Sequence, residues 1–508
     1  MNGPAAPAVD GRGEALRQDA GEDARQEAQE DAQEDGPVAA RRAREKTRDE
    51  GRRFMAASSP RSPDAHLLET DAGGHVFLPD GSRLFDAGRR LFLRFAAALD
   101  AADVGPLLDE LGVRSAPAID DVPLRAPPVH ALSLAIAQKC NLGCTYCYAQ
   151  QGEFGGAAQN MTRQAAEQAV DLLVNGAAPG ARLNLAFLGG EPLANRELLQ
   201  ETTRRARTMA DQRGVTLGFS ITTNGTLLTE EDAAFFEAFG FAVTVSLDGP
   251  REVHDRLRPF KSGKGSFDRI MRNVAPLLAR QRRMQVTARV TVTPQNLALR
   301  ATLDQLVSAG FHSVGFSPML RSPSGDAELA REDLELMLGE MIDCGREFER
   351  RTRAAEPYPF ANMLNALREI ERGTHRPYPC GAGAGYLGVS AEGELAACHR
   401  FVGDAQGAMG SLQDGIDAER RAAWLRERHV HRQEPCHRCW ARYLCGGGCH
   451  HEVIARGRPA CDYIRGWLHY CLGAYLRLSS SSAPLADRPD HAPPGAPAAA
   501  GRDEAAVG

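Results

Sequence analysis

The sequence predicts an α/β protein with a parallel central sheet, either a partial barrel of six strand–helix units or an open doubly wound sheet. Short apolar runs alternate with helical periodicity from residue 129 to about residue 320, which is typical of βαβ units. Six units are too few for a closed eight-stranded barrel. Apolar residues make up 43% of the 508 residues, which is enough to bury sizeable cores.

Composition excludes several classes of protein. The net charge is only -6, without the strong basic balance of a nucleic-acid-binding protein. No apolar run is long enough for a transmembrane helix, and the N-terminus lacks the apolar stretch of a secretory signal. We therefore expect a cytoplasmic protein without nucleic-acid or membrane partners. In a reducing compartment, its 12 cysteines are expected to bind metal or take part in catalysis.

The two ends of the chain are expected to be disordered tails. Residues 1–62 are rich in Ala, Gly, Gln and charged residues, and residues 479–508 are rich in Ser, Pro and Ala. Such segments bury too little apolar area to offset the entropy of ordering them. Residues 63–128 instead predict a small α+β element. Two short strands flank an Asp-Gly turn within residues 75–85, and helices follow near residues 89–101 and 104–112.

The central domain is expected to span residues 129–325. Its predicted strands are residues 130–137, 183–188, 216–222, 242–247, 285–292 and 312–317, with helices between them such as 162–174 and 266–278. Ligands of parallel sheets bind at the carboxyl ends of the strands. A helical bridge (residues 326–379) and a Cys- and Gly-rich region (residues 380–478) follow, and the latter has so poor a core that we expect metal to stabilise it.

Three cysteines, Cys140, Cys144 and Cys147, follow directly on the first predicted strand. Thiolates at this spacing can wrap one face of a small metal cluster and leave one corner without a protein ligand. Structural zinc sites and [4Fe–4S] clusters normally take four protein ligands. The motif therefore suggests an iron reserved for a small molecule, with a zinc loop that uses a distant fourth ligand as the alternative.

Together with the motifs that follow it, this loop resembles the radical SAM superfamily. The resemblance implies that a reduced [4Fe–4S] cluster on the three cysteines cleaves S-adenosylmethionine and that the 5′-deoxyadenosyl radical takes hydrogen from a substrate. It also implies a partial (β/α)6 barrel of the TIM type. The Gly-Gly-Glu-Pro motif would bind the amino group, polar strand ends the ribose and methionine part, and an arginine the carboxylate. The implied cofactor-binding residues are Tyr146, Gly189, Gly190, Glu191, Thr223, Asn224, Ser246, Asp248 and Arg289.

Seven further cysteines are spaced as in the SPASM domain, the auxiliary-cluster module of peptide-modifying radical SAM enzymes. The resemblance implies one auxiliary [4Fe–4S] cluster on Cys436, Cys439, Cys445 and Cys461, and a second on Cys380, Cys398 and Cys449. The second set lacks a fourth cysteine, so its cluster has an open iron or a non-Cys ligand. A zinc site on Cys436, Cys439, Cys445 and Cys449 is the alternative.

Five residues near or between these motifs have less specific interpretations. Cys344 and Cys471 are expected to be small buried core residues. His450, His451 and Glu452 follow Cys449 directly and could support the cluster, act as an acid or base, or only fix a loop.

SPASM relatives mostly modify peptides or proteins, by crosslinking ribosomal peptides, oxidising sulfatases or maturing quinohaemoprotein subunits. Local similarity of residues 146–152 and 445–452 favours an intramolecular thioether or carbon–carbon crosslink in a precursor peptide. The alternative is a sulfatase-type maturase that oxidises Cys or Ser to formylglycine. Those enzymes place an Asp where this chain has His399. A zinc-stabilised, non-catalytic binding protein is a third possibility.

The same resemblance implies two partners besides S-adenosylmethionine. The need for single electrons implies a flavodoxin or ferredoxin as reductant. Residues 63–128 would bind the leader of the precursor peptide, or would simply pack against the enzyme.

Overall fold

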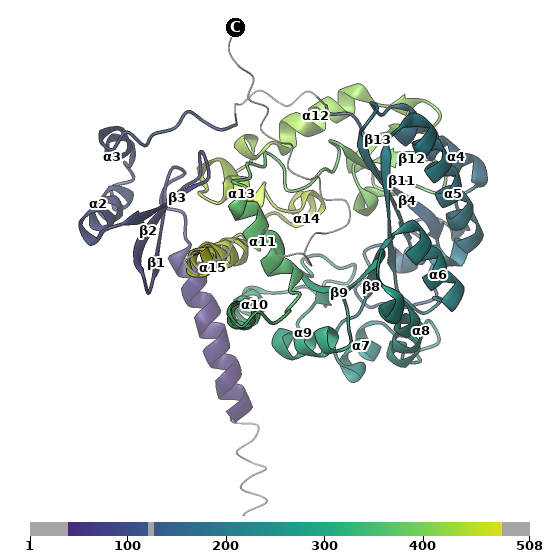
Figure 1. Ribbon diagram of the computed structural model, residues 1–508, viewed down its shortest axis with the longest axis horizontal. Coiled ribbons are helices and arrows are strands. Elements are labelled where there is room, and N and C mark those ends of the chain that lie inside the picture. The colour runs from purple at the N-terminus through teal and green to yellow at the C-terminus, as the bar shows by residue number, and fades with distance from the viewer. Residues whose placement is uncertain (1–38, 120–125, 480–508) are drawn as a thin grey trace, which may run out of the picture.

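The computed structural model describes residues 39–119 and 126–479. Figure 1 shows a small sheet with two helices on one side, a large sheet flanked by helices on the other, and long helices and irregular segments between them. Of the tails expected at residues 1–62 and 479–508, residues 1–38 and 480–508 lie outside the described residues.

Six parallel strands form the central sheet. They are β4 (Ala131–Gln138), β6 (Arg182–Gly189), β7 (Thr216–Thr223), β8 (Ala242–Ser246), β9 (Gln285–Val292) and β10 (Ser313–Pro318). The strands pair in chain order from β4 to β10, and every pairing is parallel. The predicted α/β fold with six strand–helix units is confirmed.

Helices cover the outer face of this sheet (Figure 1). They are α4 (Arg163–Asn175), α5 (Arg196–Arg213), α6 (Glu230–Phe239), α7 (Arg251–Leu257), α8 (Phe267–Arg280) and α9 (Leu299–Ser308). Two of them, α4 and α6, begin at a side chain that accepts a hydrogen bond from the first turn. The Thr162 hydroxyl accepts one from the Ala165 backbone N–H, and Thr229 and Asp232 form a capping box at α6.

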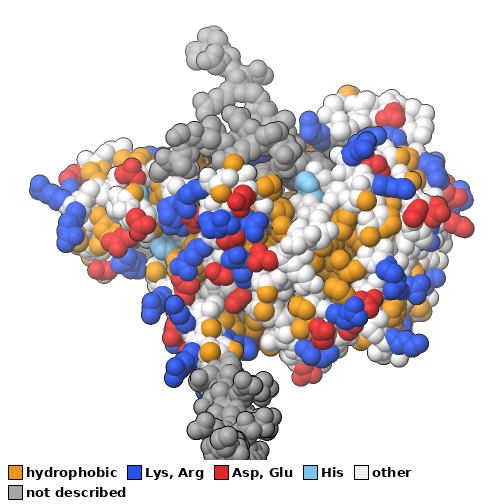
Figure 2. All heavy atoms as spheres, turned by 60° about the horizontal axis from the view of Figure 1, so that its bottom comes forward, with side chains coloured by type: hydrophobic (Ala, Val, Ile, Leu, Met, Phe, Trp, Pro, Cys, Tyr) orange, Lys and Arg blue, Asp and Glu red, His pale blue; other side chains and the backbone are white. Residues whose placement is uncertain are grey.

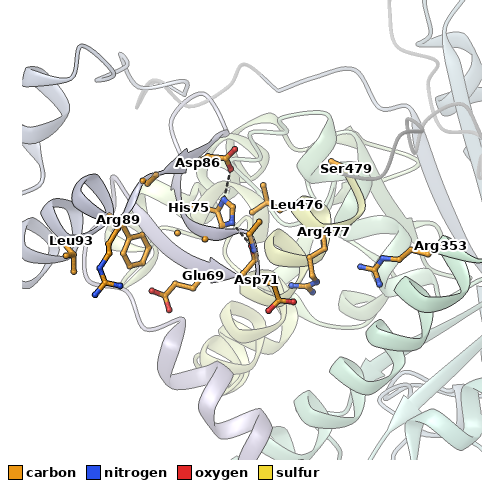
Figure 3. Close-up of a pocket in the computed structure, with 17 residues that line it drawn as sticks. Glu69, Asp71, His75, Asp86, Arg89, Leu93, Arg353, Leu476, Arg477 and Ser479 are labelled. Carbon is orange, nitrogen blue, oxygen red and sulfur yellow. Dashed lines mark hydrogen bonds and ion pairs between the residues drawn. The ribbon is translucent and has the colours of Figure 1, made fainter.

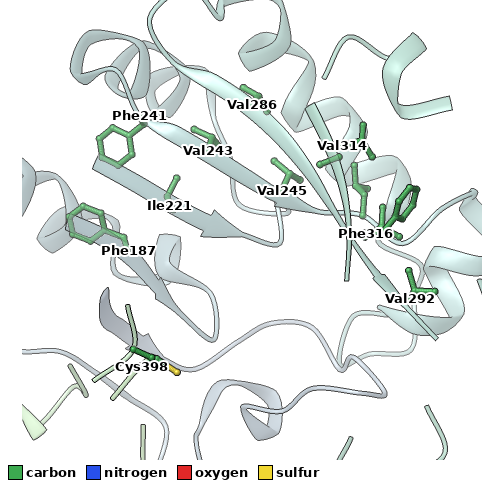
Figure 4. Packing of buried hydrophobic residues seen from close by; sticks show 14 of the residues in the cluster. Phe187, Ile221, Phe241, Val243, Val245, Val286, Val292, Val314, Phe316 and Cys398 are labelled. Carbon is green, nitrogen blue, oxygen red and sulfur yellow. The ribbon is translucent and has the colours of Figure 1, made fainter. Parts of the chain in front are cut away.

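The strands have one apolar and one polar face. Figure 4 shows Phe187, Ile221, Val243, Val245 and Val286 packed together, and all five are almost fully buried. Because side chains alternate along a strand, the intervening residues face the inner side of the sheet, where most are only half-buried or exposed. They include Ser220, Thr222, Thr244, Ser246, Thr287 and Arg289. The inner side is therefore an open polar surface that suits a polar ligand.

The Cys-rich region continues the same sheet. Strand β11 (Tyr386–Val389) pairs parallel with β4, and β12 (Glu394–Ala396), β13 (Ala408–Ser411) and β14 (Gly415–Ile416) follow antiparallel. A short strand, β5 (Gln159–Asn160), pairs with the end of β4. Main-chain hydrogen bonds thus join the expected auxiliary-cluster region to β4, the first barrel strand. This pairing was not predicted from the sequence.

Six helices complete the part of the chain after the barrel. They are α10 (Arg331–Arg353) and α11 (Ala361–Glu371) in the expected helical bridge, then α12 (Ala418–Arg428), α13 (Arg442–Cys445), α14 (His450–Arg456) and α15 (Cys461–Ser479). Short 3-10 turns lie between them.

The N-terminal element is a three-stranded antiparallel sheet of β1 (His66–Thr70), β2 (Gly73–Leu78) and β3 (Arg83–Ala87), followed by α2 (Arg89–Asp100) and α3 (Gly105–Glu110). The hairpin and both helices are present as predicted, whereas β1 was not predicted. The element has its own buried core around Phe95 and Leu99.

Residues 39–57 differ from the expected tail because they form a helix. A Cβ atom on Gly51 would lie 1.8 Å from the Glu335 carbonyl oxygen, and one on Gly339 would lie 2.0 Å from the Thr47 carbonyl oxygen. The helix and α10 therefore touch backbone to backbone. Arg52 also pairs with Glu335 at 3.1 Å. Composition alone missed the helix because its stability comes from this distant partner.

In the part of the chain that the structure describes, no helix is both long and apolar enough to cross a membrane. On the face shown in Figure 2, side chains of Lys and Arg are interspersed with those of Asp and Glu. This mixture agrees with the small net charge.

We predict that Gly339→Ala destabilises the protein by about 1–3 kcal/mol, because the added methyl group overpacks the contact with residues 39–57. Thermal unfolding would measure the change. Gly88→Ala is the matched control, since a Cβ atom there has nothing within 4 Å and φ is already -57°. Equal unfolding temperatures of the two variants would contradict the close packing.

A buried histidine pair joins β1 to α15. The His66 Nε2 and His469 Nδ1 atoms lie 2.8 Å apart, and the His66 ring stacks on Trp440 at 3.8 Å. Burial lowers the pKa of His469 from 6.5 to about 4, and burial, His469 and Arg61 lower the pKa of His66. Both rings are therefore neutral in the folded state.

We predict that this pair makes the fold acid-sensitive. The histidine pKa is 6.5 in the unfolded state and about 4 in the folded state. The resulting contribution to stability is complete above pH 6.5. It is lost as the pH falls from 6.5 toward 4, because the unfolded state then binds the proton more readily. Between about pH 7.5 and about pH 5, His469 alone would cost about 2 kcal/mol. Denaturant unfolding at both pH values should therefore show a smaller loss for His469→Gln than for the parent. Equal losses of stability in the variant and the parent would show that His469 is not a source of the acid sensitivity.

Candidate active site and cysteine clusters

Cys140, Cys144 and Cys147 lie in the loop that follows β4. Burial, together with the neighbouring thiols of Cys147 and Cys140, raises the pKa of Cys144 to about 12. Burial also raises the pKa of Cys140, which accepts a hydrogen bond from the Leu142 backbone N–H at 3.4 Å. All three cysteines are free. The structure thus gathers three half-buried thiols, of which Cys140 and Cys144 need a nearby positive charge, such as cluster iron, to ionise.

Three glycines let neighbouring segments approach this loop closely. A Cβ atom on Gly190 would lie 2.4 Å from the Lys139 carbonyl oxygen and 2.7 Å from the Cα atom of Gly152. A Cβ atom on Gly189, where φ is 145°, would lie 2.3 Å from the Ala137 carbonyl oxygen. Only glycine fits such contacts. Gly152 was not among the predicted site residues.

Glu191 ties the end of β6 to the end of β7. Its buried carboxylate accepts hydrogen bonds from the Thr223 hydroxyl at 2.7 Å, the Asn224 backbone N–H at 2.8 Å and the Leu193 backbone N–H at 3.1 Å. The side chain of Asn224 in turn donates to Cys140 Sγ at 3.6 Å. The carboxylate expected to face an ammonium group is therefore directed into the protein, where it positions the neighbouring glycines and Asn224.

Tyr146 and Asp248 form a buried triad with Arg258. The Tyr146 hydroxyl donates to Asp248, and Arg258 Nη1 donates to that hydroxyl at 2.6 Å and lies 3.8 Å from the Asp248 carboxylate. Among the described residues, Arg258 Nε has no hydrogen-bond partner. Arg258 also lowers the pKa of Cys144, which burial raises. The triad therefore holds the Arg258 cation close to Cys144 in the cysteine loop. Sequence reasoning missed Arg258 because no local motif marks it.

Ser246 and Arg289 occupy paired positions on β8 and β9. Arg289 lies on the open inner side of the sheet, and no ion pair links it to another described residue. Burial within the surrounding protein and the nearby Arg400 lower its pKa, whereas the nearby Glu452 raises it. Arg289 thus remains available to an anionic group, as expected for a carboxylate partner.

The C-terminal cysteines surround a cavity of about 530 Å³. Burial, together with the neighbouring thiols of Cys445, Cys461 and Cys439, raises the pKa of Cys436 to about 12. Burial likewise raises the pKa of Cys398 to about 12, with contributions from Cys449 and Cys380. The two expected sets are therefore each gathered in space. Cys344 and Cys471 lie apart, fully buried in the core.

The cavity wall fits anionic iron–sulfur clusters. Six of the seven C-terminal cysteines line it, together with the cationic side chains of Arg376, Arg442, Arg458 and Arg465. Over residues 39–119 and 126–479, no three Cys, His, Asp or Glu side chains converge closely enough for a single metal ion. The thiols nevertheless lie close enough to affect one another's pKa, and all but Cys398 line the same cavity.

Comparison with known proteins identifies the class. Residues 134–316 match the family model of the radical SAM superfamily. A "Serine-type anaerobic sulfatase-maturating enzyme" of Klebsiella aerogenes is 26% identical over 376 residues, covering 71% of this chain and 87% of the relative. An uncharacterised protein of Archaeoglobus fulgidus is 30% identical over 347 residues, covering 65% of this chain and 77% of the relative.

Solved structures agree with this fold. One of them, "Native anSMEcpe with bound AdoMet and Cp18Cys peptide", matches with a TM-score of 0.57 at 20% identity, over 70% of this chain and 99% of the other. The chain belongs to the radical SAM superfamily and is an enzyme of that class. Its membership excludes the non-catalytic zinc-binding alternative.

We predict that Asp248→Ala costs about 3–5 kcal/mol in unfolding free energy, because it leaves the Arg258 cation buried without its carboxylate. Denaturant unfolding would measure this loss. Asp171→Ala is the control, since Asp171 pairs with Arg205 at 3.0 Å on the surface and should cost less than about 1 kcal/mol. A similar cost in both variants would show that the buried triad is not a stabilising unit.

Proposed function

We propose that this enzyme binds S-adenosylmethionine and an iron–sulfur cluster at Cys140, Cys144 and Cys147, and that it removes hydrogen from a side chain of a peptide or protein. When bound, the cluster supplies the electron that yields the 5′-deoxyadenosyl radical. The observation that carries the proposal is the polar inner side of the sheet, which lies between the cysteine loop and Arg289. The sulfatase-maturating relative supports a polypeptide substrate.

Two reactions on such a substrate are distinguishable. The sequence favoured an intramolecular crosslink, with oxidation of a Cys or Ser side chain to formylglycine as the alternative. The comparisons favour the oxidation. A specific residue keeps the crosslink as a second candidate. His399 stands where sulfatase maturases place an Asp, and burial lowers its pKa to about 3. Its Nδ1 atom lies 2.9 Å from the Tyr386 hydroxyl.

A second cavity, of about 330 Å³, is a suitable place for the reacting part of the substrate. Its wall includes Tyr148, which follows Cys147 directly, and Arg400, which lies two residues after Cys398. The Arg400 guanidinium stacks over the Tyr148 ring at 5.2 Å. A substrate bound here would lie between the catalytic cysteine loop and the second auxiliary set.

We further propose that the N-terminal element binds a more distant part of the substrate. Figure 3 shows a groove between this element and the end of α15, with charged residues of both signs along it. Beside it, β3 is an edge strand, and Phe85 on β3 and Leu93 on α2 are the large hydrophobic side chains most exposed among the described residues. An edge strand with exposed apolar neighbours suits an added peptide strand.

The reaction is tested anaerobically with the reconstituted enzyme and matched sulfatase peptides that carry Cys, Ser or Ala at the target position. We expect the Ser peptide to become lighter by two hydrogen atoms. The Cys peptide should lose two hydrogen atoms to form a thioaldehyde, which water hydrolyses with release of hydrogen sulfide. Each product then carries an aldehyde that a hydrazide probe labels. Loss of two hydrogen atoms without an aldehyde would instead identify a crosslink. Cleavage of S-adenosylmethionine with every peptide unchanged would contradict both reactions.

Two variants control this experiment. Cys144→Ala should abolish turnover because it removes one of the three cluster thiols. Cys344→Ala should keep turnover, since Cys344 is buried in α10 away from the three cysteine sets.

A further inference from the structure

The second auxiliary set, Cys380, Cys398 and Cys449, contains three thiols. Residues 381–386, which follow Cys380, contain no cysteine. A cubane cluster has four iron corners, so one corner requires another ligand or remains open. The polar side chains that share the cavity with these thiols are therefore the candidates.

Glu452 is the only Asp or Glu among the described residues that line the cysteine cavity, and no His lines it. The arginines in the wall are cations and cannot ligate iron. His399, which is bonded to Tyr386, and His450, which packs on Trp424, are both absent from the wall. His451 lines the second cavity.

Glu452 lies close to the Cys449 thiol. Cys449 is the N-cap of α14 and Glu452 is its third residue, so both side chains lie on one face of the first turn. The Arg400 Nη1 atom lies 3.7 Å from Cys449 Sγ and donates to Glu452 Oε1 at 2.7 Å. The thiol and the carboxylate therefore both contact the same nitrogen atom.

One oxygen of this carboxylate remains available. Glu452 Oε1 accepts from Arg400, whereas Oε2 has no hydrogen bond or ion pair within the described residues. The side chain is only 13% exposed. Because Oε2 is not among the fully enclosed side-chain atoms of the described residues, it is accessible to a cation or a donor in the cavity.

We propose that Glu452, through Oε2, is the fourth protein ligand of the cluster on Cys380, Cys398 and Cys449. This assignment depends on the auxiliary cluster of the proposed function. Arg400 then orients the carboxylate, because it bonds the other oxygen and lies two residues after Cys398. The oxygen ligand would give this cluster a spectrum and a reduction potential different from those of the four-thiolate cluster.

The experiment uses the full chain with Cys140, Cys144 and Cys147 all replaced by Ala, so that only the auxiliary clusters remain. After anaerobic reconstitution we expect about eight irons per chain. Adding Glu452→Gln, whose amide oxygen can still accept from Arg400, should lose about one iron and produce the electron paramagnetic resonance signal of an oxidised three-iron cluster. Adding Glu452→Cys should restore the full iron content with a shifted reduction potential.

Glu328→Gln is the matched control, because Glu328 pairs with Arg456 at 3.0 Å at the other end of α14. It should leave iron content, Mössbauer spectrum and potential unchanged. Unchanged values in Glu452→Gln as well would overturn the ligand assignment and identify an open iron. If Cys398→Ala has the same iron content as the background protein, the second auxiliary cluster itself is absent, which is a separate failure.

Discussion

The parallel pairing of β11 with β4 is the constraint on which the placement of the cysteine sets depends. Strand β4 is buried along almost its whole length and ends two residues before Cys140. Cys380 precedes β11, and Cys398 lies two residues beyond its antiparallel partner β12. Since main-chain hydrogen bonds fix the strands at a constant spacing, the pairing places two auxiliary thiols relative to the catalytic loop.

Side-chain hydrogen bonds reinforce the pairing of the short strand β11 with β4. The Tyr386 hydroxyl donates to Ser133 on β4 at 2.8 Å, and the Gln138 side chain accepts from the Ala391 backbone N–H at 2.6 Å. Ser133 and Gln138 are buried, and β11 has only four residues. A buried polar group without a partner costs free energy, so these contacts specify one register. They explain why a Cys-rich region with little core of its own can still be ordered beside the barrel.

Buried thiols impose a second constraint, which is electrostatic. Burial raises the pKa of Cys144, Cys398 and Cys436 to about 12, so these thiols would be neutral without a cation beside them. Each set accordingly has an arginine close by: Arg258 near Cys144, Arg400 near Cys398, and Arg458 near Cys436. These cations reduce the cost of forming thiolates but do not remove it. Metal binding is therefore coupled to proton release.

The sequence predicted what is encoded locally. The six strands, the helices between them and the cysteine spacings are short-range patterns, and the structure reproduces them closely. It could not predict features that depend on distant partners. The helix over residues 39–57 needs the glycine contact with α10, and β11 needs a free edge on β4. Arg258 and Glu452 acquire their positions only when a loop or a helix turn brings them to a thiol.

The surroundings of His399 limit the role that this side chain can have in the proposed reaction. Its low pKa keeps the imidazole neutral, and a proton on it would add a positive charge beside Arg400 and Arg289, both of which lower its pKa further. His399 is therefore suited to hydrogen bonding with Tyr386 and not to taking up a proton. An Asp at the same place would be stabilised as an anion by the two arginines. If the proposed oxidation of a thiol or hydroxyl takes place beside His399, its deprotonation would therefore need another base.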